Sequence, residues 1–296
     1  MKWDDNGPSQ DLEDRRGDSP SGGGGGGFRL GGGRLGIGGF LILLVLSVVF
    51  KTDLTGALGG GNGSPFPAPA ASPASGPSLP PAQTSAEEEQ LVRYLSFVLD
   101  DAQSNWSRIF AEGNAEYPRA KLFLFRDRVN TGCGSAESAT GPFYCPADQK
   151  VYIDLGFYDE LRRRFGAPGD FAQAYVLAHE IGHHVQNVLG TDRKMRQLQQ
   201  RNPGAKNDLS VRLELQADCY AGIWGKHAQD AGRLDAGDIE EALQAASAVG
   251  DDRISEMTGG SIRPESFTHG SAAQRMTWFR RGFDTGRIEQ CNTFAQ

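Results

Sequence analysis

The chain is poor in the residues that usually build metal clusters, disulfide scaffolds and nucleic-acid surfaces. It has only five histidines and four cysteines, and no C-x-x-C pair. Without such pairs, a cysteine-ligated zinc cluster of the usual spacing is excluded. The formal net charge is −7, and the basic residues form no patch with aromatic side chains, so we expect no nucleic-acid partner. A length of 296 residues is typical of one main domain with appendages.

Long apolar runs are also scarce, and the chain has one, at residues 35–50. This run is slightly shorter than the about 20 residues that usually cross a bilayer, but its flanks carry few charges and can extend it. Arginines at positions 15, 16, 29 and 34 precede it, and only Lys51 follows closely. The positive-inside rule then predicts a single-pass membrane anchor with a cytoplasmic N-terminus. A cleaved signal peptide is disfavoured by the long region before the run, and a buried core helix by the disordered composition on both sides.

Composition divides the chain into four parts. Residues 1–33 are polar and Gly-rich, which predicts a disordered cytoplasmic segment. Residues 34–51 form the predicted transmembrane anchor. Residues 52–85 are rich in Pro, Gly, Ala and Ser and are predicted to be an extended linker. The folded domain is then expected at residues 86–296, outside the cytoplasm.

All four cysteines lie in this last part of the chain. An even number on the exported side of a membrane favours disulfides, because that compartment is oxidising. Of the three possible pairings we favour Cys133–Cys145, which would close a short Gly-rich loop. Cys219–Cys291 would then connect a central helix to the C-terminus.

Hydrophobic periodicity predicts an α+β domain that is mainly helical with a small sheet. Ser85 and Glu88 form a capping box that begins the first helix. Residues 250–268 are predicted to be a loop that lines a cleft. The other predicted elements are strands at 121–125 and 150–155, and helices at 157–165, 171–189, 207–224, 240–249 and 272–281.

The most informative motif is H-E-x-x-H, at His179, Glu180 and His183, inside an apolar stretch of helical period. Residues four apart on a helix share a face, so both imidazoles can bind one metal ion. Glu180 can reach a water in the fourth position of a zinc site. His184 turns off the ligand face, and we expect it to support the site or to be exposed.

A third ligand is predicted further along the chain. The extended motif with a third histidine is excluded, because Gln186 and Leu189 occupy the positions that it would need. Glu214 and Asp218 are four apart on the helix predicted at 207–224 and therefore share a face. Glu214 can complete a His₂Glu zinc site, and Asp218 can accept the free ring N–H of a ligating histidine.

These residues carry a resemblance to known peptidases. Glu-x-x-Ala-Asp after H-E-x-x-H resembles the glutamate-zincins. The longer strings at residues 178–186, 212–222 and 266–275, and the N-terminal string at 12–17, resemble the bacterial family described as "Putative neutral zinc metallopeptidase". The resemblance implies a zincin-like fold, a Zn²⁺ cofactor, a peptide or protein substrate and attachment to the bacterial inner membrane.

His269 and Arg275 resemble a late Thr-His-Pro…Arg element of membrane-associated glutamate-zincins, although Gly270 replaces the proline. By that resemblance His269 would donate to the oxyanion of the reaction and Arg275 would orient a carboxylate of the site. The alternative is a histidine at a helix start and a surface arginine. His227 has no motif around it and is expected at the surface.

The predicted activity is hydrolysis of peptide bonds by a zinc-activated water, with Glu180 as general base. Residues 151–155 are the candidate for an edge strand to which an extended substrate adds, and the alternative is an ordinary core strand. The alternative function is a catalytically inactive zincin-fold binding module of the cell envelope. The cleavage preference and the oligomeric state are open at this stage.

Overall fold

A computed structural model describes residues 1–18 and 85–295 of the chain. The predicted anchor at 34–51 and nearly all of the linker at 52–85 lie outside these ranges. Within the described ranges, none of the helices combines the length and apolarity that a membrane crossing needs.

A four-stranded sheet forms one part of the domain, in the order β1-β2-β6-β5. Strands β1 (Leu12–Asp14), β2 (Lys121–Phe125) and β6 (Lys150–Asp154) are parallel, and β5 (Phe143–Cys145) pairs antiparallel with β6. A separate hairpin is formed by β3 (Arg128–Thr131) and β4 (Gly134–Glu137). The predicted α+β class and both predicted strands are confirmed.

The two faces of the sheet are covered differently. Alternate residues of β2 and β6, including Leu122, Leu124, Val151 and Ile153, belong to the main core together with the helices, and all four are fully buried. The opposite face carries a smaller aromatic cluster around Tyr152, which packs with side chains of the β3–β4 hairpin. This alternation is what the two-residue period of a strand requires.

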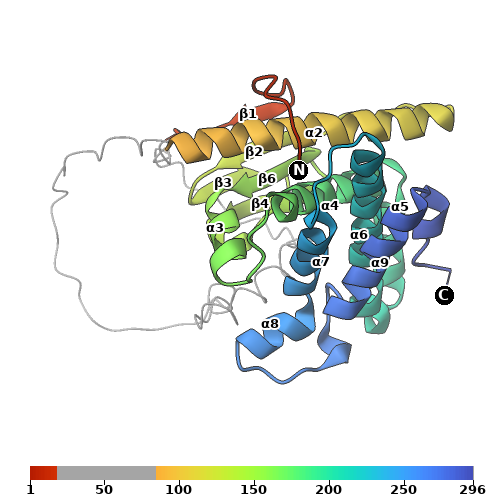
Figure 1. The fold of residues 1–296 in the computed structure, drawn as a ribbon. Helices are drawn as coiled ribbons and strands as arrows, with labels where there is room; N and C mark the ends of the chain where they lie inside the picture. The colour runs from red at the N-terminus through yellow and green to blue at the C-terminus, as the bar shows by residue number, and fades with distance from the viewer. Residues whose placement is uncertain (19–84, 296) are drawn as a thin grey trace, which may run out of the picture.

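Helices make up most of the rest of the domain (Figure 1). The longest, α2, spans Ala86–Glu112 and begins with the predicted capping box of Ser85 and Glu88. In Figure 1, α4, α6, α7 and α9 gather to one side of the sheet. The bounds of the other helices are α3 Gly156–Arg163, α4 Asp170–Val188, α5 Thr191–Arg201, α6 Lys206–Asp230, α7 Asp238–Ala248, α8 Asp251–Met257 and α9 Ala272–Thr285.

Glycines allow the central helices to approach closely. A Cβ at Gly182 of α4 would lie 3.0 Å from the carbonyl oxygen of Ala217 on α6, and a Cβ at Gly282 of α9 would lie 1.9 Å from the carbonyl oxygen of Cys219. Real Cβ contacts are not this short, so a side chain at Gly282 would push α6 and α9 apart. Disulfides Cys219–Cys291 and Cys133–Cys145 are both present, which confirms the favoured pairing.

Three local expectations differ from the structure. Residues 250–268 are not all loop, because α8 forms from Asp251 to Met257. Strand β6 is not an edge strand, because β2 and β5 pair with it on its two sides. Residues 1–18 are ordered on the domain instead of disordered, because they pack on its core and form ion pairs with it, which their own composition does not reveal.

His184 is fully buried and ties α4 to two neighbouring segments. Its Nε2 donates to the carbonyl oxygen of Pro118 at 2.6 Å, and its Nδ1 accepts from the Tyr144 hydroxyl at 2.9 Å. It therefore lies off the ligand face as predicted, but it joins α4 to Pro118 and Tyr144 instead of supporting the site or being exposed. His227 is partly exposed and lies 3.4 Å from a carboxylate oxygen of Asp101.

We expect the stability of the fold to decrease as the pH falls below about 6.5, the usual histidine value, partly through His184. Burial lowers the pKa of His184, and its bond to Pro118 offsets only part of that effect. Below pH ~6.5 the unfolded chain therefore takes up a proton at this position before the folded chain does, at up to about 1.4 kcal/mol per pH unit. Urea unfolding of wild type and His184→Gln at pH 7.5 and 5.5 measures this, and the variant should lose less stability. Equal losses in both proteins would contradict the assignment.

Candidate metal centre

Two helices bring the three predicted ligands together. His179 and His183 lie one turn apart on α4, and Glu214 lies on the facing helix α6. One ligand atom from each of the three residues lies within 4.8 Å of the others. The apolar flanks of both motifs pack into the core, so the polar groups are held at a buried helix interface.

The distances between these atoms fit a tetrahedral ion. His179 Nε2 lies 3.2 Å from Glu214 Oε2, and His183 Nε2 lies 3.6 Å from Glu214 Oε1. Ligands at about 2.05 Å from a tetrahedral zinc ion lie roughly 3.3 Å from one another. Two nitrogens and one carboxylate also form a ligand set that zinc accepts, so the residues present fit this metal.

The charges of the site favour a cation. Burial would raise the pKa of Glu214, but the adjacent His183 and His179 outweigh it and hold that pKa well below its usual value. For His183 burial lowers the pKa, but the Glu214 carboxylate outweighs it and raises the pKa to about 10. Electron pairs that hold protons this tightly are available to a divalent ion once the protons leave.

Asp218 holds the first histidine in place. It is fully buried one turn beyond Glu214 on α6, and its Oδ1 lies 2.9 Å from His179 Nδ1. This contact directs the other ring nitrogen, Nε2, toward Glu214. Arg275 of α9, only 3% exposed, donates to Asp218 from Nε at 2.8 Å and from Nη2 at 2.9 Å. Asp218 therefore contacts His179 and Arg275 contacts Asp218, and the roles predicted for both residues stay predictions.

Two further residues complete this support, and the sequence did not point to either. The Tyr175 hydroxyl donates to Asp218 Oδ1 at 2.5 Å, from one turn before His179. Gln186 Oε1 accepts from His183 Nδ1 at 2.8 Å, while its amide group donates to the carbonyl oxygen of Leu213 at 2.7 Å. The signal available in the sequence was helical spacing, because Tyr175 lies four residues before His179 and Gln186 lies three residues after His183. Both residues also fit an ordinary buried helix face.

Glu180 lies next to the ligands and has an incomplete set of partners. It is 7% exposed, and its Oε2 has no hydrogen-bond partner within the described part of the chain. Burial raises the pKa of its carboxyl above the usual value, although the two ligand histidines oppose the shift. A buried carboxylate oxygen without a partner is costly, so this atom is available to a water or substrate group.

His269 is held by an aspartate that the sequence analysis missed. Asp251 Oδ2 accepts from three successive backbone N–H groups, those of residues 268, 269 and 270, at 2.7, 2.7 and 3.0 Å. Its Oδ1 lies 3.2 Å from His269 Nδ1. The charge of His269 also contributes to the low pKa of Glu214. Asp251 is the first residue of α8, which was predicted to be loop.

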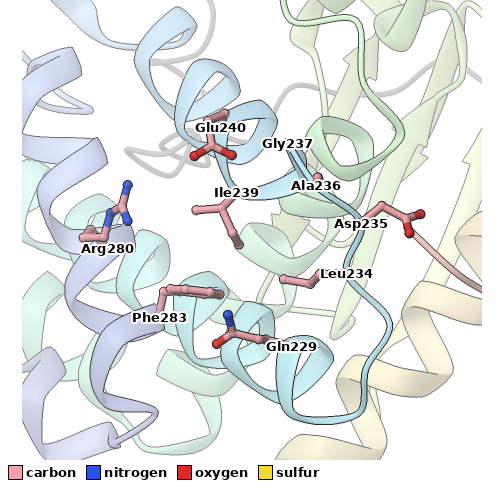
Figure 2. Close-up of a pocket in the computed structure, with 9 residues that line it drawn as sticks. All are labelled: Gln229, Leu234, Asp235, Ala236, Gly237, Ile239, Glu240, Arg280 and Phe283. Atoms are coloured by element: carbon pink, nitrogen blue, oxygen red, sulfur yellow. The ribbon is translucent and has the colours of Figure 1, made fainter.

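A surface pocket lies apart from this centre (Figure 2). It is formed where the end of α6, the start of α7 and the C-terminal part of α9 meet, with Ile239 and Phe283 on its apolar side and Glu240 and Arg280 beside them. None of the predicted site residues lines it. The chemistry of the chain is therefore expected at the interface of α4 and α6.

The comparisons with known proteins agree with this geometry. A family model described as "Putative neutral zinc metallopeptidase" matches residues 1–294. The uncharacterized protein YpfJ of Escherichia coli K12 is 46% identical over 302 residues, which cover 100% of this chain and 99% of YpfJ. The uncharacterized protein Mb2605 of Mycobacterium bovis is 48% identical over 190 residues, 60% of this chain and 64% of that protein. No solved structure matches. The chain belongs to the family described as "Putative neutral zinc metallopeptidase".

Proposed function

We propose that this protein is a zinc-dependent peptidase that hydrolyses peptide bonds at the centre formed by His179, His183 and Glu214. The observation that carries the proposal is the unpartnered, buried carboxylate oxygen of Glu180 beside three converging ligand groups. Three ligands leave one tetrahedral position open, which is the arrangement of catalytic zinc sites. A purely structural site would need no carboxylate there.

When bound, zinc would lower the pKa of a coordinated water to about 7 and polarise the scissile carbonyl. Glu180 takes the proton of the attacking water, and the rise of its pKa on burial makes it a stronger base for this step. It then passes this proton to the nitrogen of the leaving amine. Asp218 and Gln186 keep the two ligand rings from turning during these transfers.

His269 is the candidate donor to the carbonyl oxygen as negative charge develops there. Its Nδ1 is held by Asp251, and this leaves Nε2 as the free donor. Burial lowers the pKa of His269, but the Asp251 hydrogen bond and the Glu214 charge outweigh it and raise the pKa above its usual value. Nε2 can donate only while the ring is protonated, and this shift favours that form.

We expect His269→Gln to lower kcat/KM by roughly 10²–10³-fold, the usual loss when one oxyanion donor is removed. Bound zinc should stay at the wild-type level, because His269 is outside the ligand group. The matched control is His227→Gln on α6, which should keep full activity. Equal activity of His269→Gln and wild type would remove His269 from the reaction.

The edge at which a peptide substrate aligns is β5 and not β6. Strand β5 pairs only with β6 among the described strands, and it lies at the end of the sheet. It contacts the zinc helix α4 through the hydrogen bond from Asn187 to the Tyr144 hydroxyl at 3.0 Å. An extended peptide added to this edge would lie next to α4. The substrate class is therefore an extended peptide or an unfolded protein segment.

The domain is proposed to work outside the cytoplasm, attached to the inner membrane. The support is its pairing of four cysteines into two disulfides, which persist in oxidising compartments.

The test uses the full chain, with bound zinc measured beside cleavage of unfolded casein. We expect about one zinc per chain, held by the His179, His183 and Glu214 group, with cleavage that stops with 1,10-phenanthroline and returns on adding zinc. Zinc without cleavage would favour the inactive binding module. A chain that binds no zinc would remove the basis of the proposal.

A further inference from the structure

Residues 1–18 are built into the folded domain. Strand β1 extends the sheet beside β2, with Leu12, Glu13 and Asp14 in register with Leu122, Phe123 and Leu124. The backbone N–H of Leu122 donates to the carbonyl oxygen of Asp11 at 2.8 Å. Glu13 also reaches the third strand, where it accepts from Lys150 at 2.7 Å. The segment therefore forms one edge of the sheet whose other edge is β5.

Buried charges attach the segment to α2. The side chain of Arg16 is only 2% exposed, and its Nη2 lies 2.7 Å from Asp14 and 2.9 Å from Glu89 of α2. Burial would lower the pKa of Arg16, but these carboxylates outweigh it and raise the pKa. An arginine this deeply buried needs such partners, and the removal of either side would leave an uncompensated charge.

A second set of ion pairs joins the segment to Arg119 and Lys121, at the start of β2. Asp11 lies 2.8 Å from Lys121 Nζ and also pairs with Arg119. Burial would raise the pKa of Asp11, but hydrogen bonds from these two cations outweigh it and lower the pKa. Gln103 of α2 donates to the same carboxylate at 3.1 Å. Asp11 therefore joins the segment to both α2 and the sheet.

The first three residues of the segment reach α4, the helix that carries both ligand histidines. Trp3 packs edge-on against Tyr94 of α2 with ring centroids 5.6 Å apart, and Met1 is 8% exposed in the main core. The backbone nitrogen of Met1 lies 2.8 Å from Asp170, the first residue of α4. The segment thus contacts the start of the helix that carries both ligand histidines.

This arrangement conflicts with the membrane topology that the sequence predicted. A chain that crosses a bilayer once between residues 18 and 85 would have residues 1–18 on one side and the domain on the other. A strand cannot pair with β2 across a membrane. A second crossing would need about 20 further apolar residues, and residues 52–84 are instead rich in Pro, Gly, Ala and Ser.

We infer that residues 1–18 and the catalytic domain lie on the same side of any membrane that the chain contacts. Residues 1–18 then stay paired with the sheet as part of the domain. Arg16 then no longer counts toward the positive charge that precedes the apolar run, because its carboxylate partners neutralise it inside the fold.

Single cysteines on the full chain test the sidedness. Lys2 in the segment and Arg287 in the domain each have 68% of the side chain exposed. We would label Lys2→Cys and Arg287→Cys in spheroplasts with a membrane-impermeant maleimide, before and after lysis, with wild type as the background. We expect both positions to become labelled at the same stage. Labelling of one before lysis and of the other only after lysis would overturn the inference.

A crosslink in intact cells tests whether β1 is in place. Glu13 and Phe123 are partners in register, so Glu13→Cys with Phe123→Cys should form a disulfide on mild oxidation. The matched control is Glu13→Cys with Leu122→Cys, whose side chains point to opposite faces of the sheet and should remain reduced. Equal crosslinking of both pairs, or of neither, would also overturn the inference.

Discussion

Glu180→Gln should lose about 10²–10⁴-fold in kcat on a peptide substrate while it keeps its zinc. The amide has the shape of the carboxylate but cannot take a proton from water, and general acid–base groups contribute about this factor. Glu180 belongs neither to the ligand group nor to the contacts that orient it, so the metal should remain. Steady-state cleavage of a fluorogenic peptide beside elemental analysis of zinc measures both quantities.

A matched acid elsewhere on the chain controls for the loss of one negative charge. Glu112→Gln removes an exposed carboxylate at the end of α2, outside the metal centre, and should leave kcat unchanged. Full activity in Glu180→Gln would show that another group accepts the proton. Loss of zinc in Glu180→Gln would instead mean that Glu180 supports the ligand geometry.

Asp218→Asn should reduce the free energy of unfolding by about 3–5 kcal/mol and weaken zinc binding by roughly 10–100-fold. The change leaves the buried guanidinium of Arg275 without its carboxylate partner. It also removes the charged acceptor at His179 Nδ1, so the ring becomes a poorer ligand and is less firmly oriented. Urea unfolding at neutral pH and a zinc competition titration give the two numbers.

The control is a surface ion pair of the same type. Glu112 pairs with Arg108 on α2 with 62% of its side chain exposed, and Glu112→Gln should cost less than about 1 kcal/mol. If Asp218→Asn were as stable as wild type, the Asp218–Arg275 pair would not hold the interface of α4, α6 and α9 together.

The features that the sequence predicted well depend on local spacing. His179 and His183 share a face because four residues make about one helical turn. Ser85 and Glu88 form their capping box within three residues. Glu214 and Asp218 were found by the same rule, and the structure shows that this face of α6 meets α4.

The features that were missed depend on contacts between distant segments. Residues 1–18 have too few apolar side chains to fold alone, so their composition indicates disorder, yet ion pairs such as Arg16–Glu89 attach them to the domain. Tyr175 lies in an apolar helix and matches a core residue, because only the fold brings Asp218 to its hydroxyl. Strand β6 has the strongest strand pattern because it is central, and that position also prevents it from being an edge.

The most direct test of the account is X-ray absorption at the zinc edge of the purified full chain, wild type beside His183→Ala. We predict one zinc per wild-type chain, bound by two nitrogens at ~2.0–2.1 Å and a carboxylate oxygen at ~2.0–2.2 Å, and a strongly reduced zinc content in His183→Ala. Sulfur in the ligand shell, unchanged zinc in His183→Ala, or no zinc in the wild type would contradict the metal centre.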